Sequence, residues 1–185
     1  MISPLASIHP AAKLGNNVTV EPFAVISENV SIGDDTHIMS HAVILSFTTI
    51  GKGCKIFPGA VIGAVPQDLK FVGEETTVEI GDNTTIREYV TVNRGTQDKW
   101  KTAIGNNCLL MAYAHVAHDC IIGNNVIIAN GVQLAGHVEV GDYANMGGLA
   151  GANQFTRIGA HTYIAGHTVV RKDVPPFVKA GREPM

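Results

Sequence analysis

One apolar position recurs every six residues along almost the whole chain. The series begins at Ile2 and ends at Val170, and only Asp68, Glu74 and Asp98 interrupt it with polar side chains. An α-helix rotates by about 600° over six residues, so large apolar side chains at this spacing would be scattered around it. A fixed period of this length instead predicts a repeat protein with one short strand in each hexad.

A second inward position supports this interpretation, because the fourth residue after each apolar marker is small. These residues include Val18, Ala24, Val30, Thr36, Ala42, Thr48, Cys54, Ala60, Cys108, Ala114, Cys120, Val126, Val132 and Val138. Two inward side chains per hexad would fill one narrow core, which predicts an all-β parallel β-helix. All three cysteines occupy the small position, and their odd number without C-x-x-C spacing argues against disulfides and thiolate metal sites. We therefore expect three buried thiols.

The period also predicts how the chain is divided. If three hexads complete one turn, coils of about eighteen residues stack about 4.8 Å apart. We expect the β-helix to occupy residues 1–176, with loops 63–79 and 97–103 leaving it because the hexad pattern fails there. Glycine repeatedly follows the marker, as in Ile104-Gly105 and Ile122-Gly123. Asp or Asn often comes next, and we expect such residues to accommodate the tight bends between strands.

The composition is that of an ordinary globular domain, with 45% hydrophobic and 16% charged residues. The net charge is -3 and the longest basic run is Arg171-Lys172, which excludes a basic stripe that could follow a nucleic acid. The N-terminus lacks a basic segment followed by an apolar one, and no apolar stretch approaches the roughly 18 residues of a membrane span. We therefore expect a cytoplasmic protein with no transmembrane segment and no nucleic-acid partner.

The densest group of titratable side chains is the run His115-Val116-Ala117-His118-Asp119-Cys120. A step of one coil places Gly136 and then Gln154 above His118, and it places His137 above Asp119. A histidine next to a carboxylate and a backbone amide is the arrangement of a general base with an oxyanion donor. The spacing therefore predicts a polar, chemically competent edge on an otherwise apolar solenoid.

A structural interpretation of the same histidines stays open. His118 lies two residues after the inward Val116 and faces outward, as a surface or subunit-contact histidine without a chemical role also would. His115 and His137 could equally be polar residues that cap the ladders at an edge of the prism. The remaining histidines have no comparable polar neighbours, so we assign no chemistry to them.

Several short segments match the pattern of a known enzyme family. They are Pro66-Gln67-Asp68-Leu69-Lys70, Ile86-Arg87-Glu88, Asn93-Arg94-Gly95-Thr96, the run from Ala114 to Cys120, Leu134-Ala135-Gly136-His137-Val138, Gln154-Phe155 and Asp173-Val174-Pro175-Pro176. Through these segments essentially the whole chain resembles the UDP-N-acetylglucosamine acyltransferases that begin lipid A synthesis. A hexad pattern alone indicates only a broad superfamily, whereas the Gln-Asp-Leu-Lys loop combined with His-x-x-His-Asp-Cys is specific to this family.

The resemblance implies transfer of an R-3-hydroxyacyl chain from acyl carrier protein to the 3-position of the glucosamine in UDP-N-acetylglucosamine. It implies that His118 is the general base, that Asp119 orients it, and that the Gly136 amide stabilises the oxyanion. It implies neither a metal nor a cofactor. It also implies the following substrate-binding residues: Gln67, Asp68, Lys70, His115, His137, Gly148 near the acyl hydroxyl, Gln154, and Gly166 at the position that limits acyl length.

The same resemblance implies a left-handed, three-sided prism and a homotrimer with active sites between protomers. Members of the family continue into a helical C-terminal domain. We therefore expect residues 177–185 to begin an extension whose helical part is absent from this chain. The sequence has Asn93 and Asn153 where better known members carry histidine, which implies different substrate contacts at these two points.

Three alternatives stay open from the sequence. A γ-carbonic-anhydrase-like enzyme with the same fold would bind zinc through three histidines, for which His115, His118 and His137 are available. A non-catalytic β-helix would serve as a scaffold, although that role does not call for a His-x-x-His-Asp cluster beneath a glycine amide. A related acyltransferase acts on a sugar amine, and no residue in the sequence decides between ester and amide formation.

Overall fold

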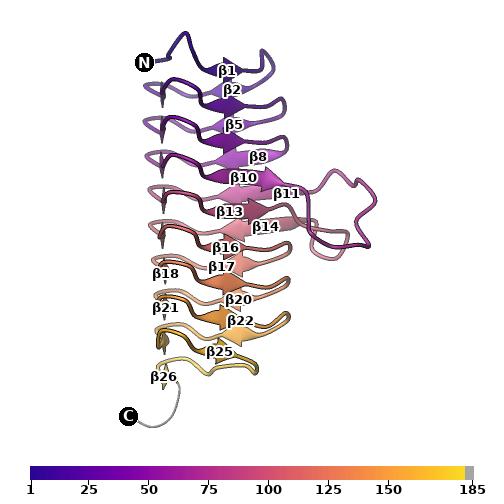
Figure 1. Ribbon diagram of the computed structural model, residues 1–185, viewed down its shortest axis with the longest axis vertical. Helices are drawn as coiled ribbons and strands as arrows, with labels where there is room; N and C mark the ends of the chain where they lie inside the picture. Colours follow the sequence, from indigo (N-terminus) through magenta and orange to yellow (C-terminus); the bar gives the residue numbers. More distant parts are fainter. Residues whose placement is uncertain (182–185) are drawn as a thin grey trace.

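The computed structural model describes residues 1–181, and these form 26 short strands in three parallel sheets. The sheets are the three faces of one upright prism, and the chain winds along it coil by coil, from the N-terminus at the top of the view to the C-terminus at the bottom (Figure 1). From β1 to β25, consecutive strands belong to successive faces, and each strand from β4 onward pairs in parallel with the strand three positions earlier. The predicted left-handed parallel β-helix is confirmed.

Each face takes one strand from each coil. Face 1 contains β1 (Ser7–Ile8), β4 (Val25–Ile26), β7 (Val43–Ile44), β10 (Val61–Ala64), β13 (Thr91–Asn93), β16 (His115–Val116), β19 (Gln133–Leu134), β22 (Gly151–Ala152) and β25 (Val169–Val170). Face 2 contains β2 (Lys13–Leu14), β5 (Ser31–Ile32), β8 (Thr48–Ile50), β11 (Thr77–Ile80), β14 (Lys101–Ile104), β17 (Ile121–Ile122), β20 (Glu139–Val140) and β23 (Arg157–Ile158). Face 3 contains β3 (Thr19–Val20), β6 (His37–Ile38), β9 (Lys55–Ile56), β12 (Thr85–Ile86), β15 (Leu109–Leu110), β18 (Ile127–Ile128), β21 (Asn145–Met146), β24 (Tyr163–Ile164) and β26 (Lys179–Ala180).

The ladder register follows the predicted coil length, as when Val116 of β16 pairs with Leu134 of β19. Two loops lengthen the step between neighbouring coils, and both protrude from the same edge of the prism (Figure 1). One occupies residues 65–76 between β10 and β11, within the expected 63–79. The other occupies residues 94–100 between β13 and β14, earlier than the expected 97–103, because β14 pairs along its whole length with β11 and draws residues 101–104 back onto face 2.

The two inward positions of each hexad form one continuous core. The apolar marker residues and the small residues between them are almost all less than 5% exposed, as the periodicity predicts. The thiols of Cys54, Cys108 and Cys120 are free and buried, which confirms the expectation for the cysteines. Burial raises the pKa of all three thiols, and it raises the pKa of Cys120 to about 12.

The glycines after the marker allow neighbouring coils to approach closely. A Cβ on Gly105 would lie 2.5 Å from the carbonyl oxygen of Gly123 in the next coil, so the glycine permits close approach between stacked backbones. The left-handed φ values of these corners fall two residues after the marker glycine, often on asparagine, as at Asn107 (φ 56°) and Asn125 (φ 57°). The asparagines therefore accommodate the bends as expected, whereas the glycines allow the close approach.

The C-terminal part of the described chain continues the prism. Strand β26 pairs with β24 on face 3, so the ladder of this face reaches Ala180. The segment expected to begin a C-terminal extension, residues 177–185, therefore starts as part of face 3. Residues 182–185 of this segment lie outside the described residues. Within residues 1–181, no helix is long and apolar enough to cross a membrane.

Candidate active site

His118 and Asp119 form a hydrogen-bonded pair at the corner between β16 and β17. The Nδ1 atom of His118 lies 2.8 Å from Oδ2 of Asp119. The Asp119 side chain is fully buried and that of His118 is 14% exposed, so the pair sits at the surface with its carboxylate inward. The neighbouring Val116 and Cys120 are anchored in the core and fix the corner that presents the two side chains.

The loop of residues 94–100 supplies the other partners of Asp119. The backbone N–H of Thr96 donates to Oδ1 over 2.9 Å and its hydroxyl donates to Oδ2 over 2.7 Å, while the N–H of Lys99 donates to Oδ1 over 3.2 Å. Burial alone would raise the pKa of Asp119, but the hydrogen bonds from Thr96, His118 and Lys99 together outweigh it and hold the pKa below its ordinary value. The carboxylate is therefore ionised at neutral pH, accepts the Nδ1 proton of His118 and leaves Nε2 as the basic nitrogen.

Gly136 lies directly against the ring of His118, as the coil arithmetic predicts. A Cβ on Gly136 would be 2.5 Å from Cε1 and 2.7 Å from Nε2 of the imidazole. The adjoining N–H of His137 donates to the carbonyl oxygen of His118 over 3.0 Å and fixes the register between the two coils. Only a residue without a side chain fits at this point beside the basic nitrogen.

The amide of Gly136 differs from its equivalents at the corner between faces 2 and 3. There the N–H of Asn106 donates to Oδ1 of Asn124 over 2.9 Å, and the N–H of Asn124 donates to Oδ1 of Asp142 over 2.6 Å. In each case a side chain of the next coil caps the amide. Among residues 1–181, no acceptor caps the amide of Gly136. The donor thus stays free next to His118, as an oxyanion site requires.

His137 completes the cluster. Its ring stacks on Phe155 with a centroid separation of 4.3 Å and meets the ring of His118 edge-on at 5.0 Å. Its Nε2 lies 3.8 Å from Oδ2 of Asp119. Its Nδ1 lies 3.1 Å from Oδ2 of the exposed Asp98, although the two are not aligned as a hydrogen bond. Two carboxylates therefore flank the second imidazole, one buried and one exposed.

A cavity of about 340 Å³ opens beside this cluster. Both loops reach it, since the 65–76 loop contributes Asp68 and Lys70 and the 94–100 loop contributes Thr96 and Asp98. Its lining residues are Asp68, Lys70, Phe71, Glu74, Thr96, Gln97, Asp98, His137 and Phe155. The predicted residues Asp68, Lys70 and His137 are thus brought together, whereas Gln67 is exposed and does not line the cavity.

His115 and Gln154 do not line this cavity. His115 projects from β16 on face 1, where its Nδ1 is 2.7 Å from the hydroxyl of Thr91. Burial, and secondarily the nearby His118, lower the pKa of His115 and favour its neutral form. A shallow groove of about 290 Å³ on this face includes His115 and Asn153. Gln154 is exposed in the coil above Gly136.

Gly148 and Gly166 are not part of the His118 cluster. They stack on each other at the corner between faces 3 and 1, where a Cβ on Gly166 would lie 3.0 Å from the Gly148 carbonyl oxygen. Face 1, with its groove, separates this corner from the one that carries His118. The predicted site residues therefore fall on both edges of one face.

Sequence reasoning missed three residues of the cluster. Thr96 belongs to the matched Asn-Arg-Gly-Thr segment but received no role, because its partner Asp119 is far away in the sequence. Asp98 interrupts the apolar series, and that irregularity could have drawn attention to it. Phe155 follows Gln154 in a matched segment, and only the coil register places it on His137.

The zinc alternative requires three histidines around one point, and the structure does not assemble the predicted set. The group whose ligand atoms all lie within 4.8 Å of one another consists of His118, Asp119 and His137, without His115. Both carboxylate oxygens of Asp119 already accept hydrogen bonds from Thr96, Lys99 or His118. The donor arrangement found among residues 1–181 therefore suits a base and its orienting partner better than a three-histidine metal centre.

Comparisons with known proteins give a consistent result. The family model described as "Bacterial transferase hexapeptide (six repeats)" matches residues 29–64 and 101–136. A curated protein of Chlamydia abortus, named Acyl-[acyl-carrier-protein]--UDP-N-acetylglucosamine O-acyltransferase, is 51% identical over 119 residues, which are 64% of this chain and 43% of that protein. One of the same name from Thermodesulfovibrio yellowstonii is 50% identical over 123 residues, or 65% and 47% of the two chains. The match thus spans less than half the length of these relatives.

Solved structures extend the likeness to the whole chain. A structure from Bacteroides fragilis, described as LpxA, a UDP-N-acetylglucosamine acyltransferase, is 54% identical with a TM-score of 0.98 and covers 100% of this chain and 72% of its own. The LpxA structure from Acinetobacter baumannii is 44% identical with a TM-score of 0.97, and the match covers 99% of this chain and 71% of that one. Both likenesses include the two loops and the corner that carries His118.

Proposed function

Because this chain belongs to the UDP-N-acetylglucosamine acyltransferase family, we propose that it transfers an R-3-hydroxyacyl chain from acyl carrier protein to the 3-hydroxyl of UDP-N-acetylglucosamine, the first step of lipid A biosynthesis. The observation that carries the proposal is the pairing of His118 with the buried Asp119 beside the uncapped amide of Gly136. A base and an oxyanion donor at one point are what acyl transfer from a thioester needs.

In the proposed reaction, Nε2 of His118 accepts the proton of the sugar hydroxyl while the hydroxyl oxygen attacks the thioester carbonyl carbon. Asp119 holds the ring through Nδ1 and stabilises the imidazolium that forms. The N–H of Gly136 donates to the developing oxyanion. When the intermediate collapses, the C–S bond breaks, the new ester bond remains, and the proton on His118 passes to the departing sulfur of the carrier.

The substrate contacts follow from the two edges of face 1. We place the nucleotide sugar in the cavity with Asp68, Lys70 and His137, where a lysine and two aromatic rings offer charge and stacking. His115 and Gln154 lie near the reacting carbonyl, and Gln67 contacts substrate from the loop. The acyl chain lies over face 1 toward Gly148 and Gly166. The side of one coil is at most about 20 Å long, which accommodates a long acyl chain.

A homotrimer and a cytoplasmic location belong to the same proposal. The cavity and His118 open on the outer edge of a flat-sided prism, so a second copy packed along face 1 would close the site. Sedimentation at micromolar concentration is expected to give a trimer, and a monomer would contradict this part. The three unpaired thiols agree with a reducing compartment.

The experiment is incubation with UDP-N-acetylglucosamine and 3-hydroxyacyl carrier proteins of graded length, followed by mass spectrometry of the product. We expect one acyl group on the sugar nucleotide, and release by mild base identifies an ester rather than an amide. His118→Ala should abolish product. His41→Ala, which changes a corner histidine stacked on Phe23 in a distant coil, should not. Equal product from the His118 variant would remove the proposed base.

A further inference from the structure

Arg94 lies at the point where both loops leave the prism. It is the first residue after β13, and only 7% of it is exposed. Its backbone N–H donates to the carbonyl oxygen of Ala64 over 2.8 Å, and Ala64 is the last residue before the 65–76 loop. The same chain segment leads within two residues to Thr96, which holds Asp119. Arg94 therefore touches the beginnings of both segments that build the cavity.

The guanidinium of Arg94 lies over two aromatic rings. Its Cζ is 5.0 Å from the ring centroid of Phe47, at a corner of the prism, and 5.7 Å from that of Phe71, in the 65–76 loop. Phe71 lines the cavity and follows Lys70 directly. The N–H groups of Lys70 and Phe71 both bond back to Asp68, so these residues form one compact turn. The contact of Arg94 with Phe71 thus fixes the turn that carries Asp68 and Lys70.

Arg94 places a charged group in a largely buried position. Burial lowers the pKa of Arg94, whereas the carboxylates of Glu74 and Glu75 in the same loop favour its charged form. A planar guanidinium can stack on rings from both sides while staying charged, which a lysine ammonium cannot do. Its buried Nε has no hydrogen-bond partner among residues 1–181, so the contacts with Phe47 and Phe71 are what hold the side chain.

The side chain of Asn93 also holds the beginning of the 65–76 loop. Its side-chain Nδ2 donates to the carbonyl oxygen of Val65 over 2.6 Å, at the first residue of the loop. Asn93 is only 3% exposed. In this chain the side chain is used inside the protein to hold the loop.

We propose that Arg94 is a positioning residue for the acceptor, acting through Phe71 to hold Asp68 and Lys70 over the cavity. This inference rests on the proposed function, because it concerns binding of the nucleotide sugar rather than the chemistry at His118. Arg94 is not expected to touch the reacting atoms. Its loss should therefore weaken acceptor binding while leaving turnover at saturation close to that of the wild type.

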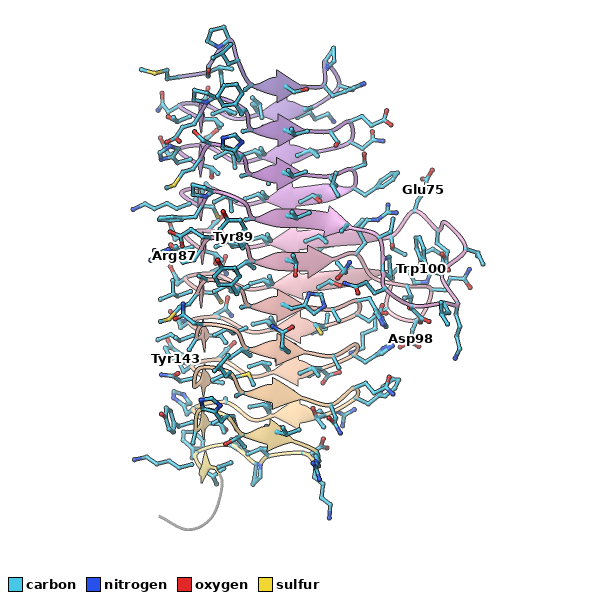
Figure 2. The ribbon with its side chains drawn as sticks, viewed as in Figure 1. Glu75, Arg87, Tyr89, Asp98, Trp100 and Tyr143 are labelled. Carbon is cyan, nitrogen blue, oxygen red and sulfur yellow. The ribbon has the colours of Figure 1, made fainter. Side chains whose placement is uncertain are left out.

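The test compares Arg94→Met with Arg87→Met. Arg87 also stacks on an aromatic ring, 4.5 Å from the centroid of Phe57, but it lies at the edge of the prism opposite the loop that carries Glu75 (Figure 2). For Arg94→Met we expect the KM for UDP-N-acetylglucosamine to rise about tenfold, equivalent to about 1.4 kcal/mol, with kcat changed less than about twofold. Arg94→Lys should recover part of the loss. Arg87→Met should leave both constants unchanged.

A second measurement does not depend on catalysis. Lys70 is exposed, and trypsin cuts after it only when the turn opens. We expect Arg94→Met to accelerate release of the 1–70 fragment about tenfold, and Arg87→Met to have no effect. If the wild type shows no acyl transfer, the proposed function fails while this measurement still judges the role of Arg94. Wild-type KM and wild-type cleavage in Arg94→Met would overturn the inference.

A double-variant cycle tests the route through Phe71. Phe71→Leu removes the ring from the loop side without altering the core of the prism, so it stays informative if Arg94→Met does not fold. We expect Phe71→Leu to accelerate cleavage after Lys70 as Arg94→Met does, and the double variant to be no worse than either single variant. Additive effects would mean that Arg94 does not act through Phe71 and would refute the proposed route.

Discussion

Thr96 donates both its backbone N–H and its hydroxyl to the carboxylate of Asp119, which is separated from it by 23 positions in the chain. The two hydrogen bonds go to different carboxylate oxygens, and one of those oxygens also accepts the Nδ1 proton of His118. The loop of residues 94–100 thus forms part of the support for the proposed base. Substitutions in this loop should therefore affect His118 through Asp119, even if no residue of the loop contacts the acyl group.

Thr96→Val removes the hydroxyl donor and leaves the backbone donor in place. The pKa of Asp119 should rise, since a hydrogen bond that favours the ionised form is lost. We expect the free energy of unfolding at pH 7 to fall by about 1.5–3 kcal/mol, measured by urea denaturation. Thr49→Val, which changes an exposed threonine on face 2, is the matched control and should change stability by less than about 0.5 kcal/mol.

The pH dependence of stability provides a further check on Asp119. Because its folded-state pKa lies below the ordinary value of 3.8, its contribution to stability is complete above that value and is lost as the pH falls through the lowered pKa. Unfolding curves from pH 5 downward should show this loss in the wild type. Asp119→Asn should flatten the dependence, and an unchanged slope in the variant would show that Asp119 is not held ionised.

Gly136→Ala should separate activity from stability. The new Cβ would meet the end of the His118 ring, a side chain that can rotate outward, so the prism should survive while the base is displaced. We expect acyl transfer to fall about a hundredfold, as for loss of a positioned general base, with a melting temperature within a few degrees of the wild type. Normal activity in a folded variant would contradict the close packing of Gly136 and His118.

Gly105→Ala, in contrast, should destabilise the fold. Here the added Cβ would meet backbone atoms of Gly123 in the next coil, and stacked backbones cannot rotate away. We expect a loss of about 1–3 kcal/mol in the free energy of unfolding, by analogy with overpacked cores. If Gly105→Ala is as stable as the wild type, the interpretation of these glycines as close-approach positions is wrong.

The cysteines should be unreactive in the folded protein. All three thiols are buried and have raised pKa values, that of Cys120 to about 12, so little thiolate exists at pH 8. Ellman's reagent should titrate none of them under native conditions and all three in denaturant. Rapid reaction of a native thiol would indicate that the prism opens locally near that cysteine.

The sequence by itself determined the parallel β-helix, because each hexad repeats the same inward pair and stacked coils bury every pair in one core. The left-handed, three-sided winding was implied only by the resemblance. The period alone also placed Gly136 over His118 and His137 over Asp119, since ladder register copies sequence spacing wherever no loop intervenes. Tertiary structure alone decided the rest. The two loops break the period, so spacing could not show that Thr96 reaches Asp119, that Asp68 and Lys70 face His137, or that Arg94 lies over Phe47 and Phe71. These contacts join segments whose separation follows no repeat, and only the path of the folded loops brings them together.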